Sequence, residues 1–209
     1  MSGDKIIDPV HALPGRSTPF LAMPFRHRVL GAPLNSHFDN AQEIYLAFGC
    51  FWGAEKLYWQ TEGVLMTAVG YMGGVTPNPT YDEVCTGRTG HAETVRVTFD
   101  PQVLPVEEVL RLFFENHDPT QGMRQGNDVG AQYRSAIWCT GSGQYIAATA
   151  IRGQYQGALL GEGYGQITTT IEMAEGHPFY PAEAEHQQYL EANPFGYCPV
   201  HATGVCLVR

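Results

Sequence analysis

The sequence has few charged residues and no long apolar run. Charged side chains make up 16% of its 209 residues, against roughly 25% in typical domains. No stretch approaches the roughly 18 apolar residues that a membrane-spanning helix requires. The N-terminal residues MSGDKIIDPVHALPG carry proline and charge where a secretory signal needs an apolar core. These absences predict no membrane span and a cytoplasmic location.

Runs of lysine and arginine are also missing. The chain has 12 basic and 21 acidic residues, which give a formal net charge of −9. Because a nucleic-acid surface needs clustered positive charge, we expect no nucleic-acid partner. The hydrophobic fraction of 44% is enough for a sizeable core, and the length fits one domain with extensions.

The cysteines form no CxxC pair. They are Cys50, Cys85, Cys139, Cys198 and Cys206. Their odd number argues against a secreted disulfide framework, and the lack of closely spaced ligand pairs argues against structural zinc. In a reducing compartment, cysteines with a function tend to be catalytic or redox-active. We expect Cys85 and Cys139 to be passive small hydrophobes.

The hydrophobic pattern divides the chain into an irregular N-terminal arm (1–42), a catalytic α+β domain (43–192) and a Gly/Pro-rich tail (193–209). Apolar runs and alternation predict strands, and amphipathic segments predict helices. The strands are expected at 44–48, 64–71, 92–99, 133–138 and 167–173, and the main helices at 51–60, 105–116, 142–160 and 181–192. The central order is typical of the split βαβ, or ferredoxin-like, arrangement. We therefore predict an open mixed or antiparallel sheet with flanking helices and long loops.

The pentapeptide Gly49-Cys50-Phe51-Trp52-Gly53 lies between a predicted strand and a predicted helix. Cys50 would begin that helix, where free backbone N–H groups and the helix dipole stabilise a thiolate. The glycines would leave the backbone open to a small substrate, and the two aromatic rings would lie beside the sulfur. A buried structural cysteine among core aromatics is an alternative of comparable weight for the pentapeptide alone.

Glu93 lies on the core-facing side of the predicted strand 92–99. It shares that face with Val95, Val97 and Phe99. Burial disfavours a carboxylate and raises its pKa, so Glu93 could donate a proton near neutral pH. The alternative is that the strand end frays and Glu93 turns to water.

Two tyrosines and two late cysteines complete the candidate set. Tyr81 follows a loop rich in proline, and Tyr133 is expected to open a strand; phenols beside a carboxylic acid could hold a polarised oxygen. Either ring could instead serve only packing. In a mobile Gly/Pro-rich tail, Cys198 and Cys206 could resolve a sulfenic acid. Idle thiols are the alternative, because a static disulfide conflicts with a reducing compartment.

Several long motifs resemble peptide methionine sulfoxide reductases of type A. They are GCFWG (49–53), GYMGG (70–74), PNPTYDEVCTGRTGHAE (77–93), NHDPTQGMRQGNDVGAQYRS (116–135) and HPFYPAEAEHQQYLEANPFGYC (177–198). The resemblance covers roughly residues 43–206 and, through Pro14-Gly15-Arg16, part of the arm. So many long motifs in one order make the resemblance specific.

The resemblance implies that Cys50 attacks the sulfur of methionine S-sulfoxide, free or in protein. Glu93 would give its proton to the sulfoxide oxygen, and Tyr81 and Tyr133 would donate hydrogen bonds to it. The residues that match positions near the substrate are Phe51, Trp52, Asp128 and His186. Methionine would leave, and Cys50 would remain as a sulfenic acid.

The resemblance also implies a relay of thiols and no bound cofactor or metal. Cys198 would form a disulfide with Cys50, Cys206 would then attack Cys198, and thioredoxin would reduce the outer disulfide of a monomeric enzyme. The family usually has a glycine-dominated segment between the two tail cysteines, whereas this chain has PVHATGV at 199–205. Because Pro199 stiffens the chain, we expect recycling to be slower than the first chemical step.

Two other functions compete with a reductase. A cysteine-dependent acyl transferase or hydrolase would need a histidine base for Cys50, and it would leave the tail cysteines without a purpose. A non-catalytic methionine-binding module would use the aromatic residues and would tolerate the loss of Cys50.

Overall fold

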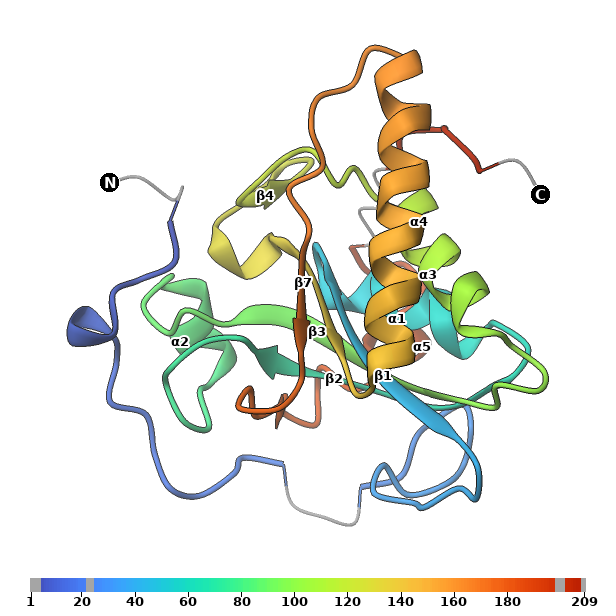
Figure 1. Cartoon of the computed structure of the whole chain (residues 1–209). Helices are drawn as coiled ribbons and strands as arrows, with labels where there is room; N and C mark the ends of the chain where they lie inside the picture. Colours follow the sequence, from blue (N-terminus) through green and yellow to red (C-terminus); the bar gives the residue numbers. More distant parts are fainter. Residues whose placement is uncertain (1–4, 22–24, 198–201, 208–209) are drawn as a thin grey trace.

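The computed structural model describes residues 5–21, 25–197 and 202–207. Its centre is a six-stranded mixed sheet in the order β7-β6-β1-β3-β2-β8 (Figure 1). The strands are β1 (Gln42–Phe48), β2 (Val64–Met72), β3 (Ala92–Phe99), β6 (Ser135–Cys139), β7 (Thr170–Met173) and β8 (Tyr180–Pro181). Only β6 and β7 pair in parallel. The predicted α+β class with a mixed sheet is confirmed.

Three helices cover one face of this sheet (Figure 1). They are α1 (Phe51–Trp59), α3 (Val106–Glu115) and α4 (Ser142–Gly161). Alternate residues of β1, including Ile44 and Leu46, point into this layer and are fully buried. The amphipathic helix predicted at 105–116 is confirmed, because α3 buries Val109, Leu110, Phe113 and Phe114.

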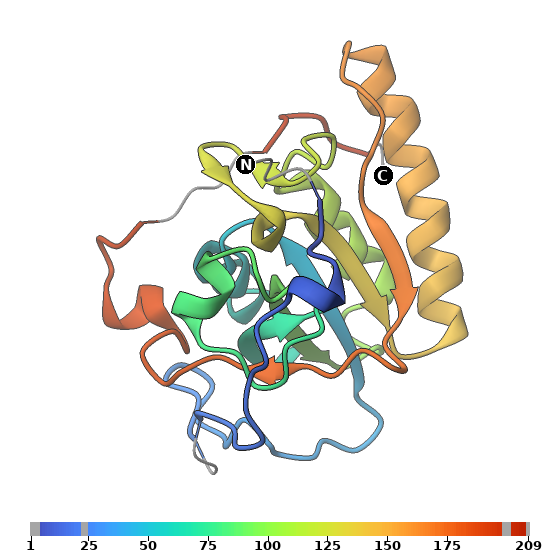
Figure 2. The same ribbon diagram turned by 90° about the vertical axis from the view of Figure 1, so that its left-hand side faces the viewer.

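The N-terminal arm crosses the other face of the sheet, in front of the strands in Figure 2. A short 3-10 helix, η1 (Pro9–His11), is its first regular element among the described residues. Leu21 and Leu34 pack against Met66 and Ala68 of β2. The arm is therefore irregular in backbone but contributes apolar core to the back of the sheet.

Arg16 ties the arm to the helix that carries Tyr81. Its guanidinium donates two hydrogen bonds to Glu83 in α2 (Tyr81–Cys85), at 2.6 and 2.9 Å. Glu83 also completes a capping box with Thr80 at the start of α2. The arm thus fixes the beginning of a helix far away in the sequence.

The prediction of a helix at 181–192 is wrong. Only α5 (Tyr189–Ala192) is helical there, and Tyr180–Pro181 forms the edge strand β8. Gln187 uses its side-chain amide to pair with the backbone of Val69, and Gln188 has a φ of +49°. A left-handed residue of this kind interrupts a right-handed helix, and a side chain that pairs with β2 holds the segment against the sheet.

Two smaller boundaries also differ from the sequence prediction. Tyr133 ends a 3-10 helix, η2 (Ala131–Tyr133), and β6 begins only at Ser135. The polar loop at 117–130 contains a short hairpin of β4 (Arg124–Gln125) and β5 (Asp128–Val129). Both differences lie where the chain passes beside Cys50.

Candidate active site

Cys50 lies in the turn between β1 and α1 and is the N-cap residue of α1. Gly49 makes this turn with a φ of +97°, which favours glycine. A Cβ at Gly49 would lie 2.8 Å from Cγ of Gln125, which belongs to the hairpin of the polar loop. The glycine therefore admits a protein side chain at this point, whereas the sequence suggested an opening for substrate.

The net shift of the Cys50 pKa is opposite to the predicted lowering. Burial and the neighbouring Glu93 raise the pKa of the Cys50 thiol, although the backbone N–H groups of Trp52 and Gly53 lower it. The helix terminus acts in the expected direction, but the loss of hydration outweighs it. The net result is a thiol that binds its proton more tightly than a free cysteine does.

Glu93 faces Cys50 from the neighbouring strand pair. Its side chain is 1% exposed, and its Oε2 accepts a hydrogen bond of 3.0 Å from the backbone N–H of Phe51. Burial raises the pKa of Glu93 to about 8, against the opposing effect of the Phe51 N–H and with a further contribution from Asp128. The carboxyl group is therefore largely neutral at pH 7 and can donate a proton.

Tyr81 and Tyr133 approach the same carboxyl group from α2 and η2. Burial raises the pKa of both phenols, and the charge of Glu93 raises it further. Tyr133 also contributes to the raised pKa of Tyr81. The two hydroxyls thus stay protonated as hydrogen-bond donors within electrostatic reach of Glu93.

An aromatic wall flanks this cluster; we use the term for Phe51, Trp52, His186 and Tyr189. Phe51 is buried, and its ring centroid lies 6.4 Å from that of Trp52. Tyr189 stacks on Trp52 at 3.9 Å, and the Trp52 Nε1–H donates a hydrogen bond of 3.3 Å to Nδ1 of His186. Such a wall offers a polarizable apolar surface for a thioether or methyl group.

Asp128 completes the polar side of the site. Its Oδ1 accepts a hydrogen bond of 3.1 Å from the hydroxyl of Tyr197, and its buried Oδ2 has no hydrogen-bond partner among the described residues. Its charge raises the pKa of both Glu93 and Cys50. The carboxylate therefore helps to keep both groups protonated.

Sequence reasoning missed two residues of this region. Glu183 accepts hydrogen bonds from the Tyr81 backbone N–H and from the Tyr71 hydroxyl, both at 2.8 Å. Tyr189 stacks on Trp52 as described. Both residues come from the segment that was predicted as one long helix. Nothing in the sequence indicated the path that this segment takes, and so neither residue could be placed at the site.

Of the two tail cysteines, the structure describes Cys206. Cys198 lies outside the described residues. Cys206 is an exposed free thiol beside a hollow formed by α4 and residues 203–206. Glu115 accepts a hydrogen bond of 2.7 Å from the Leu207 N–H, and Tyr155 donates one of 3.1 Å to the Val205 carbonyl. The described tail is thus fastened to α3 and α4.

Within the described part of the chain, no group of three or more His, Cys, Asp or Glu side chains could hold a metal ion. None of the described helices is long and apolar enough to cross a bilayer. No hydrogen bond joins a described histidine to Cys50, so the geometry offers no base–nucleophile pair of the kind that a hydrolase needs.

Comparison with known proteins gives consistent matches. The family model described as "Peptide methionine sulfoxide reductase" matches residues 42–205. Peptide methionine sulfoxide reductase MsrA of Corynebacterium kroppenstedtii is 55% identical over 205 residues, which cover 96% of this chain and 93% of that protein. Methionine sulfoxide reductase A of Corynebacterium diphtheriae superposes with a TM-score of 0.88 at 46% identity, covering 98% of this chain and 100% of the other.

A more distant structure shows a complex. Mxr1 from Saccharomyces cerevisiae in complex with Trx2 matches with a TM-score of 0.51 and 25% identity, covering 80% of this chain and 94% of that chain.

The raised pKa of Glu93 predicts a pH dependence of stability. The folded state keeps this proton up to about pH 8, whereas an unfolded glutamate releases it near pH 4.3. Folded protein thus binds more protons, and the stability contribution is lost as the pH rises. Between pH 6.5 and 8, the free energy of unfolding of wild type, measured with urea, should fall by up to about 1.4 kcal/mol per pH unit relative to that of Glu93→Gln.

This window excludes the buried histidines. Burial lowers the pKa of His27, His91 and His117 to about 4, so their contributions change only below about pH 6.5. Parallel stability curves for wild type and Glu93→Gln between pH 6.5 and 8 would show that Glu93 is not protonated in the folded state.

Proposed function

The chain belongs to the peptide methionine sulfoxide reductase family, and we propose that Cys50 is its nucleophile and Glu93 its proton donor. The protein reduces methionine sulfoxide to methionine. The observation that carries the assignment is the hydrogen bond from the Phe51 N–H to Glu93, which holds a largely neutral carboxyl group beside the Cys50 thiol. Membership of this family excludes the two alternative functions, a cysteine-dependent acyl transferase or hydrolase and a non-catalytic methionine-binding module.

The first step balances with the groups present. The Cys50 sulfur forms a bond to the sulfoxide sulfur, and Glu93 protonates the sulfoxide oxygen, with Tyr81 and Tyr133 donating hydrogen bonds to it. The thiol proton passes to the Glu93 carboxylate as the S–S bond forms. The hydroxyl group then moves to the Cys50 sulfur, which gives methionine and a sulfenic acid. Cys50 is oxidised, and the sulfoxide is reduced.

The aromatic wall and Asp128 would select the substrate. Phe51 and Trp52 would hold the methyl group, with His186 behind the Trp52 ring. Asp128 would accept a hydrogen bond from the substrate backbone or from a water through its unpartnered Oδ2. We propose the S epimer, free or in protein, as the form that places its oxygen toward Glu93.

The sulfenic acid would be resolved by Cys198 with release of water, and Cys206 would then attack Cys198. Thioredoxin would reduce the Cys198–Cys206 disulfide, a role that the Mxr1–Trx2 complex supports by analogy. A thiol relay of this kind needs a reducing compartment, and we therefore place the protein in the cytoplasm. No bound cofactor enters these steps, and one chain supplies every group, so we propose a monomer.

We further propose the division into arm (1–42), catalytic domain (43–192) and tail (193–209). Within the domain, the strand order β6-β1-β3-β2 with antiparallel neighbours supports a ferredoxin-like core. β7 and β8 would be additions at its two edges.

Removal of the nucleophile or the acid should stop the first step. With a methyl sulfoxide substrate and dithiothreitol, we expect Cys50→Ser to be inert. Glu93→Gln keeps the side-chain shape but has no proton to give, and its kcat should fall about 10²–10⁴-fold. Activity of Glu93→Gln within about threefold of wild type would remove Glu93 from the mechanism.

The tail cysteines should matter only for recycling. Cys198→Ser should reduce about one equivalent of sulfoxide per chain and then stop when thioredoxin is the reductant. Cys139→Ala is the control, because it removes a thiol that the relay does not use and that lies in the core opposite Ile44 of β1. If Cys198→Ser turns over with thioredoxin at the wild-type rate, the relay is wrong.

Recycling should limit the overall rate. We expect single-turnover reduction to be faster than thioredoxin-supported turnover, because Pro199 stiffens the link from Cys198 and residues 203–207 are fastened to α3 and α4. Rapid-quench and steady-state measurements test this comparison. Equal rates for the two would reject a slow recycling step.

A further inference from the structure

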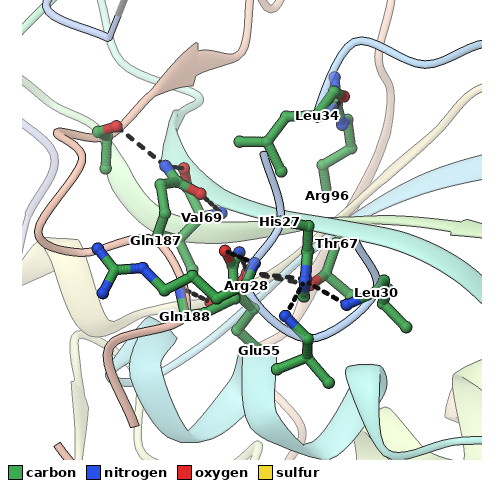
Figure 3. A network of polar contacts seen from close by, with 12 residues as sticks. His27, Arg28, Leu30, Leu34, Glu55, Thr67, Val69, Arg96, Gln187 and Gln188 are labelled. Carbon is green, nitrogen blue, oxygen red and sulfur yellow. Dashed lines mark hydrogen bonds and ion pairs between the residues drawn. The ribbon is translucent and has the colours of Figure 1, made fainter. Parts of the chain in front are cut away.

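Glu55 is a fully buried carboxyl group that the proposed reaction does not use. It lies on α1, one turn after Phe51 and Trp52. Its oxygens accept three hydrogen bonds (Figure 3). The Thr67 hydroxyl (3.0 Å) and the Gln188 side-chain amide (2.6 Å) donate to Oε1, and the Gln188 backbone N–H (2.8 Å) donates to Oε2. Burial raises the pKa of Glu55 to about 7, whereas the hydrogen bonds from Gln188 and Thr67 lower it.

The hydrogen bonds around Glu55 run in one direction. Nδ1 of His27 accepts from the backbone N–H groups of Val29 and Leu30, so the ring proton lies on Nε2. Nε2 then donates a hydrogen bond of 2.8 Å to the Thr67 hydroxyl. The Thr67 hydroxyl in turn donates its hydrogen bond to Glu55. Each partner of Glu55 is a donor, and only an acceptor at this position satisfies all of them.

Gln188 is the residue that this carboxyl group holds. Its φ of +49° is unfavourable for a side-chain-bearing residue. Besides its two hydrogen bonds to Glu55, its Oε1 accepts one of 3.2 Å from the backbone N–H of Arg28 in the arm. Contacts from α1 and from the arm thus stabilise a strained backbone at one position.

This strained position lies between two residues of the aromatic wall. The ring centroid of Tyr189 is 3.9 Å from that of Trp52, and that of His186 is 5.8 Å away. Gln188 is the N-cap of α5, and so its backbone sets the direction in which Tyr189 leaves. A change in the Gln188 backbone would therefore move these rings relative to Trp52.

We propose that Glu55 is a positioning residue that, through Gln188, holds His186 and Tyr189 against Trp52 and thereby shapes the substrate-binding wall. The arm also helps to hold Gln188, because His27 donates to Thr67 and the Arg28 N–H donates to Gln188. This inference rests on the proposed role of Trp52 in binding substrate. Glu55 has no hydrogen bond to Cys50 or Glu93, so its influence acts on binding.

The variant that tests this is Glu55→Gln. It keeps the side-chain shape but places an NH₂ group among hydrogen-bond donors, which leaves at least one of them unpaired. A wall that contacts ground state and transition state alike changes KM and leaves kcat nearly constant. We expect KM to rise about 5–10-fold and kcat to stay within about twofold in the dithiothreitol-supported assay.

Two further variants remain decisive if Glu55→Gln does not fold. Gln188→Met removes both side-chain hydrogen bonds of Gln188 at similar length, and its KM should rise as for Glu55→Gln. Thr67→Val removes one donor and leaves the Gln188 contacts, so its KM should rise less, about 2–3-fold.

Gln144→Ala is the matched control for a lost buried network. Gln144 is 5% exposed and bonds Thr140, Gln42 and the Glu43 carbonyl at the far end of β1 from Cys50. It should lower the thermal midpoint as the Glu55 variant does, but its KM should equal that of wild type. Trp52→Leu is the reference for the wall and should raise KM at least as much as Glu55→Gln.

The outcomes separate the inference from the proposed function. If Trp52→Leu raises KM but folded Glu55→Gln and Gln188→Met do not, Glu55 is only structural, while the function stands. If Trp52→Leu also leaves KM unchanged, both the wall and its positioning by Glu55 are wrong. A rise in KM for Gln144→Ala equal to that for Glu55→Gln would show a general effect of destabilisation, and it would also overturn the inference.

Discussion

The hydrogen bond between the Phe51 N–H and Glu93 is the contact on which the site depends. It joins the first residue of α1 to β3, two elements that are not neighbours in sequence. β3 pairs with β1 on one side and β2 on the other, and Tyr71 stands opposite Glu93 in that register. A shift of β3 by one residue would turn Glu93 to the other face of the sheet. The sheet register therefore fixes the distance between acid and thiol.

Burial, and not this contact, raises the pKa of both groups, because the Phe51 N–H lowers the pKa of Glu93. A helix terminus stabilises an anion by about 0.3–1 kcal/mol, and by about 2 kcal/mol at most in partly buried geometry. Complete burial can shift a pKa by about 3–5 units, or about 4–7 kcal/mol. Burial thus dominates at Cys50, and Glu93 shares its environment. In the proposed first step, the thiol, the substrate oxygen and the carboxyl group would exchange one proton, with no stable thiolate before substrate binds.

The periodic hydrophobic pattern of single strands and helices was sufficient to predict much of the fold and the burial of Glu93. The alternation of β3 placed Glu93 among buried valines, and the stripe of α3 gave its packed face. The segment at 181–192 has a helical pattern, but Gln187 pairs with β2 and Gln188 has positive φ. Neither contact has a local signal. Glu55 was missed for a related reason, because one acid in an amphipathic helix has the sequence pattern of a surface residue.

Several weak contacts hold the described end of the tail to α3, α4 and Tyr164. Residues 203–207 are held by hydrogen bonds from Tyr155 and Tyr164 and by the bond of Leu207 to Glu115. Arg111 adds a hydrogen bond to the Leu207 carbonyl, and each of these bonds contributes about 1 kcal/mol. Any motion that carries Cys206 away from α4 must break them. The first chemical step needs no such release, since the described groups assigned to it lie on β3, on α2, on the short η2 turn and in the turn between β1 and α1.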